Sequence, residues 1–221
     1  VNLIIDEATR AGLDPDQAPP EKVGRDGVSI ASLDDMARAL DGIDLSQTPI
    51  LIRAAVAGVP MLAMLAALMR RQGKDTRTLQ GCIEVDPLGA MAWTGRLPLS
   101  LERAYDEMAL LVNWSQAHAP DLDVIGVHSY PYHNAGASAV QELAYAIASG
   151  EAYLRAMSER GLDVNTVAPR MRFFFSVGTN FFMEVAKLRA ARLLWSQVVE
   201  AFGGDADAGR MVIHARSALY N

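Results

Sequence analysis

The feature that most constrains the fold is a series of short apolar runs, each about as long as a β-strand, spread along the whole chain. Several are rich in β-branched or aromatic residues, which favours strands. They do not alternate cleanly with polar residues, which is typical of strands buried on both faces. The runs are Val1–Ile5, Pro49–Val56, Gly81–Val85, Asp123–Ser129, Arg172–Val177 and Met211–Ala215. The sequence therefore predicts six strands.

Helical patterns fill the gaps between these runs. Ser32, with Asp35 three residues later, predicts a capped helix start. A further helix is expected over 138–150, ending at Gly150 because glycine commonly terminates helices. A long amphipathic helix is expected within 180–204. The residues predicted to face the core from this last helix are Phe182, Val185, Leu188, Ala191, Leu194, Trp195 and Val198.

The repeated strand–helix order predicts βαβ units, which form a parallel sheet with right-handed crossovers. A (β/α)8 barrel of the TIM type needs roughly 250 residues, and the chain has 221. We therefore expect an α/β fold, a barrel fragment with about six of the eight strands, as a single domain over 1–221. A doubly wound open sheet is the alternative, although no G-x-G-x-x-G follows an expected strand.

Charge and cysteine content narrow the function classes. The net charge is −6, so general binding to nucleic acid or to an anionic membrane is disfavoured by repulsion. The one cysteine, Cys82, cannot form an internal disulfide, which fits a reducing, cytoplasmic compartment. The longest apolar run, Ala57–Met69, contains a proline and is short for a membrane span, so it is expected to be a core helix.

Polar residues stand at the carboxyl ends of the expected strands, where the active sites of α/β barrels gather. The barrel prediction therefore brings them towards one mouth. They are Asp6, Arg53, Glu84, Asp86, His128, Tyr130, His133, Gly178, Thr179, Asn180, His214 and Arg216.

The residues alone leave the chemistry of these strand ends open. His128 and His133 have a spacing seen in some zinc ligand pairs, but Pro131 lies between them in an expected turn. Acid–base work by His128, His133 or His214 is a second interpretation, because histidine titrates near neutrality. Arg170 and Arg172, just before the aromatic run, either grip a phosphate or carboxylate or are a pair of solvated charges.

The segment RFFFSVGTNFFMEVAKLRAARLLW, residues 172–195, resembles the signature segment of the adenosylcobalamin-dependent methylmalonyl-CoA mutase family. GVSIASLDDMARALDGIDL, YHNAGASAVQELAYAIASGEAYLRAM and GLDVNTVAPRMRFFF extend the resemblance. It implies a barrel with an acyl-CoA along its axis, and an adenosylcobalamin on a separate domain that supplies the radical chemistry. That domain's D-x-H-x-x-G motif is not found, so the cobalamin-binding domain is expected to be absent from this chain.

The chain departs from the catalytic pattern of this family at several positions. T-I-Q-N-D reads CIEVD here, with Glu84 in place of the glutamine. Thr94 stands where the resemblance implies a carboxylate-binding arginine. Pro131 stands where it implies a catalytic histidine, with His133 two residues later. These changes resemble the small, non-catalytic subunit, which pairs with a catalytic subunit in a heterodimer; a homodimer is the other assembly considered.

The resemblance also carries over substrate contacts. Arg170 matches a CoA-contacting arginine, whereas Arg172 replaces a CoA-contacting serine. HARS keeps His214 of an expected H-S-Q pattern and replaces the glutamine with Arg216. We therefore expect Arg170, His214 and Arg216 to be the substrate-binding candidates.

Two other functions remain open at this point. In an active acyl-CoA mutase with altered substrate preference, Thr94 accepts an uncharged acyl group and His133 replaces the lost histidine. In an unrelated metal-dependent barrel enzyme, His128, His133 and Glu84 form the site. The catalytic candidates are therefore His133, His128 and Glu84.

Overall fold

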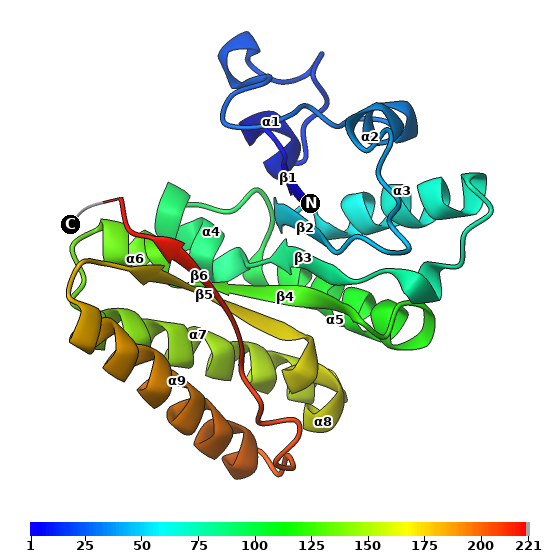
Figure 1. The fold of residues 1–221 in the computed structure, drawn as a ribbon. Coiled ribbons are helices and arrows are strands. Elements are labelled where there is room, and N and C mark those ends of the chain that lie inside the picture. Colours follow the sequence, from blue (N-terminus) through cyan, green and yellow to red (C-terminus); the bar gives the residue numbers. More distant parts are fainter. Residues whose placement is uncertain (220–221) are drawn as a thin grey trace. The chain divides into compact units, whose positions relative to one another are not determined.

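The structure, a computed structural model, describes residues 1–219 as alternating strands and helices (Figure 1). The strands are β1 (Asn2–Ile4), β2 (Ile50–Ala55), β3 (Gly81–Val85), β4 (Leu122–His128), β5 (Met171–Val177) and β6 (Val212–Ser217). They follow one another in the sheet in sequence order, and the described pairs β1–β2, β2–β3, β3–β4 and β5–β6 are parallel. The predicted α/β class and the six barrel-type strands are confirmed.

Nine α-helices lie between these strands in the described part of the chain. They are α1 (Glu7–Arg10), α2 (Leu33–Ala39), α3 (Gly58–Arg71), α4 (Pro87–Thr94), α5 (Leu101–His118), α6 (Tyr130–Asn134), α7 (Ala139–Glu159), α8 (Val164–Val167) and α9 (Phe181–Ala201). Ser32 caps α2 as predicted, because its side chain accepts a hydrogen bond from the Asp35 N–H at 3.2 Å. No helix within residues 1–219 is long and apolar enough to cross a membrane.

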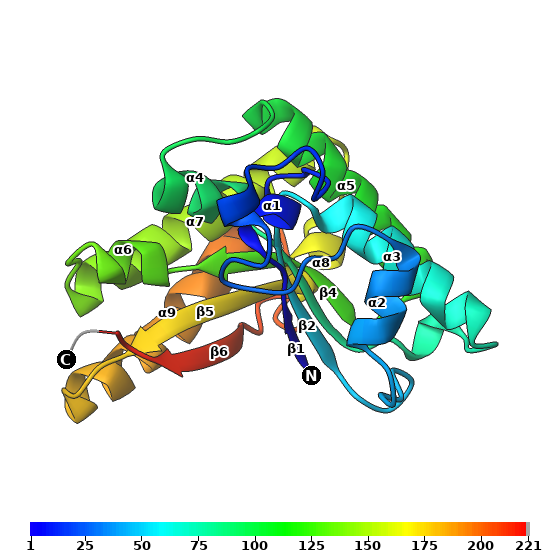
Figure 2. The same ribbon diagram turned by 90° about the horizontal axis from the view of Figure 1, so that it is seen from above.

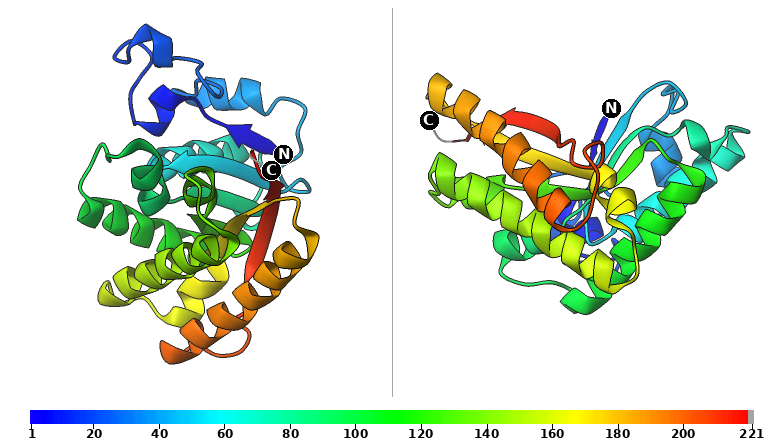
Figure 3. Two further views of the ribbon diagram at one scale, coloured as in Figure 1. Left: turned by 90° about the vertical axis from the view of Figure 1, so that its left-hand side faces the viewer. Right: turned by 90° about the horizontal axis from the view of Figure 1, so that it is seen from below.

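The described residues divide into two compact units. Unit 1 comprises Val1–Pro87 and Leu97–Ile125, and in it α3 packs against α2 and α5 (Figure 2). Unit 2 comprises Leu88–Arg96 and the described chain from Gly126 onward, and in it α7 and α9 lie side by side (Figure 3). The division into units does not test the single domain expected over 1–221, which stays a prediction.

Gly150 does not end a helix, so that prediction is wrong. Helix α7 continues through Gly150 to Glu159. A Cβ at Gly150 would lie 2.8 Å from Trp195 Cζ3 and 2.9 Å from Phe173 Cζ. Both contacts are shorter than packed carbon atoms tolerate. The glycine therefore serves the close approach of two aromatic rings to α7.

The predicted core face of α9 is wrong in its first half. Phe182 is 83% exposed and Val185 is 41% exposed, and Leu194 is also exposed, whereas Ala191 and Trp195 are buried as predicted. The buried residues of this helix are Glu184, Lys187, Ala191, Trp195 and Val199. Hydrophobic periodicity treats Glu184 and Lys187 as surface residues, but the two are buried together as an ion pair.

Candidate functional site

The two last strands of unit 2 present cationic and aromatic side chains on one face. Phe174 of β5 pairs in register with His214 of β6, and Ser176 pairs with Arg216. Because side chains alternate along a strand, Arg172 lies on the Phe174 side of β5. The opposite side of β5 packs against the helices, where the rings of Phe173 and Trp195 are 4.7 Å apart.

His128 is the centre of an aromatic cluster on this face. It is the last residue of β4 and is buried. Its ring stacks on Phe174, with centroids 4.3 Å apart and planes at 20°. Tyr130 meets the same imidazole edge-on at 5.1 Å, and His214 lies 5.2 Å from Phe174. The contacts lock His128 among rings, as expected for a packed core residue.

Tyr130 connects this cluster to two further side chains. The guanidinium carbon of Arg216 lies 5.0 Å from the Tyr130 ring centroid, a cation–π distance. Trp93 of α4 meets Tyr130 edge-on, with centroids 5.8 Å apart. We call Trp93, His128, Tyr130, Phe174, His214 and Arg216 the aromatic face.

A second cluster, the buried ion network, lies between the helices and strand ends of unit 2. It comprises Ser129, Glu142, Ser176, Glu184 and Lys187. Glu142 Oε1 accepts hydrogen bonds from Ser129 Oγ at 2.5 Å and from the Ser176 N–H at 2.9 Å. Glu142 Oε2 accepts one from Lys187 Nζ at 2.7 Å. Lys187 Nζ also donates to the Ser176 carbonyl oxygen at 2.7 Å and lies 2.6 Å from Glu184 Oε2.

His133 belongs to this network and not to the aromatic face. Its Nδ1 lies 3.4 Å from Glu142 Oε2, and its side chain is 16% exposed. The segment that holds it is the short helix α6, so the turn expected at Pro131 is wrong. Proline is compatible with a first helical turn because its missing N–H would be unpaired there.

The candidates in unit 1 contact groups of the protein itself. Glu84 is buried, and its Oε2 lies 3.9 Å from Arg53 Nε. Asp6 caps α1, accepting the N–H groups of Thr9 at 2.8 Å and Gly24 at 2.7 Å. Burial alone would raise the pKa of Asp6, but the hydrogen bonds from Thr9 and Gly24 outweigh it, so the pKa is lowered. Asp6 is therefore held as a carboxylate and is a poor proton donor.

Two further candidates also bond within their own segments. Thr94 Oγ1 lies within hydrogen-bond distance of the carbonyl oxygens of Ala90, at 2.8 Å, and Arg96, at 2.6 Å. Arg170 ends the 3-10 turn before β5, and its Nη1 donates to the Thr166 carbonyl oxygen at 2.8 Å. Arg170 therefore stands at the amino end of β5.

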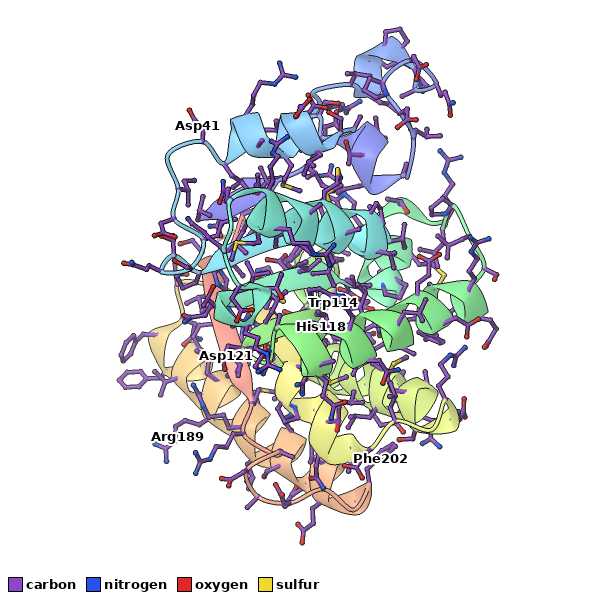
Figure 4. All side chains as sticks on the ribbon, turned by 90° about the vertical axis from the view of Figure 1, so that its right-hand side faces the viewer. Asp41, Trp114, His118, Asp121, Arg189 and Phe202 are labelled. Atoms are coloured by element: carbon purple, nitrogen blue, oxygen red, sulfur yellow. The ribbon has the colours of Figure 1, made fainter. Side chains whose placement is uncertain are left out.

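The structure divides the unit 2 candidates between two clusters. Within unit 2, His128, Tyr130, His214 and Arg216 meet on the aromatic face, whereas His133 lies in the buried ion network. The fourth histidine, His118, lies beside Trp114 on α5 (Figure 4). Among residues 1–219, no three His, Cys, Asp or Glu side chains gather as a metal site.

Sequence reasoning missed Trp93, Glu142 and Lys187. Glu184 and Lys187, three residues apart on one side of a helix, carried the only available signal of an ion pair. That signal is weak because such pairs are most often solvated. Trp93 had none, since it lies within the short helix α4, which the pattern did not predict.

The fold and the aromatic face define an α/β barrel-type protein whose strand ends carry packed histidines and arginines. Comparison with known families then identifies it further. The family described as methylmalonyl-CoA mutase matches residues 1–221. The chain belongs to this family.

Individual relatives agree with this assignment. The chain is 36% identical to the methylmalonyl-CoA mutase of Rhizobium meliloti (strain 1021) over 203 residues, which is 91% of this chain and 28% of that protein. It is 36% identical to the methylmalonyl-CoA mutase large subunit of Porphyromonas gingivalis over 204 residues, covering 92% and 28%. A probable large subunit of Mycobacterium tuberculosis (strain H37Rv) is 37% identical over 203 residues, covering 91% and 27%. The chain therefore spans little more than a quarter of each relative's length.

Proposed function

We propose that this chain is a barrel portion of a non-catalytic, small-type subunit of a methylmalonyl-CoA mutase. In this role it supports a catalytic mutase subunit that interconverts methylmalonyl-CoA and succinyl-CoA with adenosylcobalamin. The proposal includes a heterodimer, because the mutase relatives in Porphyromonas gingivalis and Mycobacterium tuberculosis carry the name large subunit.

The observation that carries the proposal is the structural role of Thr94 and Pro131. By resemblance these positions hold a carboxylate-binding arginine and a catalytic histidine. Here the Thr94 hydroxyl lies within hydrogen-bond distance of two main-chain carbonyl oxygens at the end of α4, and buried Pro131 stands in the first turn of α6. Neither side chain carries a charge or a titrating proton, so neither reproduces the chemistry of the residue it replaces.

The placement of His133 argues against the active mutase with altered preference. That alternative needs His133 to act on the thioester in place of the missing histidine. Its Nδ1 instead faces Glu142 Oε2 in the buried ion network, at 3.4 Å. Glu84, another catalytic candidate, faces Arg53 in unit 1, and His128 is packed between Phe174 and Tyr130.

The histidines do not fit the role of a cobalt ligand. Three of them face neighbouring rings: His118 faces Trp114, His128 stacks on Phe174, and His214 lies beside Phe174. His133 faces Glu142. We therefore assign adenosylcobalamin, which the family implies, to the catalytic partner or to another domain. The predicted thioester contacts Arg170, His214 and Arg216 remain part of the proposal.

The test uses the natural polypeptide that carries this sequence and the catalytic mutase chain of the same organism. Each is assayed for methylmalonyl-CoA isomerisation with adenosylcobalamin, alone and mixed. We expect no turnover by the polypeptide alone and full turnover only when the catalytic chain is present. Turnover by the polypeptide alone would overturn the proposal.

A variant of His133 sharpens this test. His133→Ala in the assembled complex is expected to keep the rate within about twofold, whereas loss of a general acid typically costs roughly 10²–10⁴-fold. His118→Ala, on α5 in unit 1, is the matched control. A fall of a hundredfold or more for His133→Ala alone would favour the active-mutase alternative.

A further inference from the structure

The buried ion network joins the short helix α6 to the helices α7 and α9 of unit 2. Helix α6 follows β4 directly and packs against α7 and β5 (Figure 1). His133 is the α6 residue that enters the network, and its Nδ1 lies 3.4 Å from Glu142 Oε2. Within residues 1–219 this buried nitrogen has no hydrogen-bond partner, although it faces a carboxylate oxygen. The strength of the contact therefore depends on whether the imidazole carries a second proton.

The charges of the network do not balance while the imidazole is neutral. Glu142 and Glu184 supply two carboxylates, and Lys187 is the one described ammonium that pairs with them, at 2.7 Å and 2.6 Å. These three side chains are each 10% exposed or less. A buried charge without a compensating partner is costly. Protonated His133 supplies the second cation and cancels the remaining negative charge.

The elements around His133 determine which charges act on its proton. Helix α7 contributes Glu142, which is the ion-pair partner of His133 within the described residues. Helix α9 contributes Lys187, which shares the same oxygen and opposes protonation, and Glu184, which favours it. Strand β5 contributes Ser176, which is uncharged and donates its N–H to Glu142. Two carboxylates against one ammonium leave the balance in favour of the protonated imidazole.

We propose that protonation of His133 strengthens the packing of α6 against α7, so that the order of the segment after β4 depends on pH near neutrality. The proton comes from solvent, which reaches the 16% of the His133 side chain that is exposed. The imidazolium then donates a charge-assisted hydrogen bond from Nδ1 to Glu142 Oε2. The inference concerns the chain's own fold and does not depend on the proposed function.

Tyr130 extends the effect of this proton to the aromatic face. It is the first residue of α6, and the guanidinium carbon of Arg216, from β6, lies 5.0 Å from its ring centroid. Its ring also contacts Trp93 and His128. Because Tyr130 and His133 lie on one short helix, looser packing of α6 also loosens the hold on Tyr130.

The direction of the pH dependence follows from the charge pairing. The proton stabilises α6 when the helix is packed beside Glu142 and not when it is open to water. An exposed histidine has a pKa of about 6.5. The added stability is therefore fully present below that pH and is lost as the pH rises into the weakly alkaline range. For a partly buried charge pair we expect a difference of about threefold to tenfold in local opening.

Hydrogen exchange by mass spectrometry on the natural polypeptide, between about pH 5.5 and pH 8.5, tests the inference. The protection factors of the amides in α6 and the first turn of α7 are corrected for the pH dependence of intrinsic exchange. We expect them to fall by about threefold to tenfold across this range. His133→Gln keeps a hydrogen-bonding side chain that does not titrate, so its protection factors should be equal at both ends of the range.

Two further variants sharpen the test. Glu184→Gln removes the excess negative charge without altering the contact between His133 and Glu142. It should shrink the pH dependence of α6 protection, because the network is then balanced without the extra proton. His118→Gln is the matched control, since His118 lies on α5 in unit 1 and packs beside Trp114. It should keep the full dependence.

Three results would overturn the inference. The first is α6 protection in the unaltered polypeptide that is independent of pH, a result that needs no variant. The second is a pH dependence that persists in His133→Gln, which would assign the proton to a carboxylate of the network. The third is a full dependence in Glu184→Gln. The unaltered polypeptide and Glu184→Gln keep the test decisive if His133→Gln fails to fold.

Discussion

The ammonium group of Lys187 is buried, since the residue is only 3% exposed. Lys187→Met tests the contribution of its ion pairs to stability. Methionine keeps an unbranched apolar side chain and removes the charge. The change leaves Glu142, which is fully buried, without the donor at 2.7 Å on Oε2. It also leaves Glu184 without its partner at 2.6 Å.

The expected cost follows from this burial. Removing one member of a buried ion pair typically destabilises a protein by about 3–5 kcal/mol, because the remaining charge stays buried without compensation. Since each 1.4 kcal/mol is about a factor of ten, local opening of unit 2 should rise by roughly two to three and a half orders of magnitude. A domain is stable by only about 5–15 kcal/mol in total, so the effect is large.

Hydrogen exchange measured by mass spectrometry on the natural polypeptide gives this local free energy directly. Amides of α7, β5 and α9 should lose protection in Lys187→Met. Arg155→Met is the matched control, because Arg155 pairs with Glu151 on the surface of α7. Loss of an exposed pair costs at most about 1 kcal/mol.

Two results would refute this reasoning. The first is a cost for Lys187→Met no larger than that of Arg155→Met. The second concerns the double variant Glu142→Gln with Lys187→Met, which should be less destabilised than the two single costs added together, because it removes both charges of one pair. Simple additivity would mean that Glu142 and Lys187 do not interact.

Three further predictions rest on local geometry. Gly150→Ala should destabilise unit 2 by about 1–3 kcal/mol in denaturant unfolding, because overpacking outweighs alanine's helix preference. The pKa of Asp6 is lowered, since hydrogen bonds from Thr9 and Gly24 outweigh burial. The ionised Asp6 therefore stabilises the fold above the unfolded pKa near 3.8, and this stabilisation is lost as pH falls through the folded pKa. In Asp6→Asn, the free energy of unfolding measured against pH should fall less steeply in this acid range. A hydrogen bond from Lys74 lowers the pKa of Asp44 to about 2, so Lys74→Met should raise it towards 3.8 in an NMR titration.

The strands were predictable because their signal is local. Runs such as Gly81–Val85 and Arg172–Val177 are continuous and apolar, and the structure places β3 and β5 within one residue of these bounds. The start of α2 was predictable for the same reason, since Ser32 and Asp35 form their reciprocal bonds within one turn.

The candidate site was predictable only as a set of residue types at strand ends. His128 and His133 are near neighbours in sequence, yet one stacks on Phe174 of β5 and the other faces Glu142 of α7. Phe174 is distant along the chain from His128, and Glu142 lies on the helix that follows the one holding His133. Periodicity within one segment contains no information about which distant group a side chain will meet.

The sequence by itself determined the alternation of strands and helices, the parallel barrel-type order and the family, because these depend on local patterns and on long segments with a family resemblance, such as 172–195. Only the tertiary structure decided that Trp195 and Phe173 pack against Gly150, that Lys187 is buried and that His133 faces Glu142. Each of these depends on steric fit or charge pairing between segments, and such contacts exist only once the chain has folded.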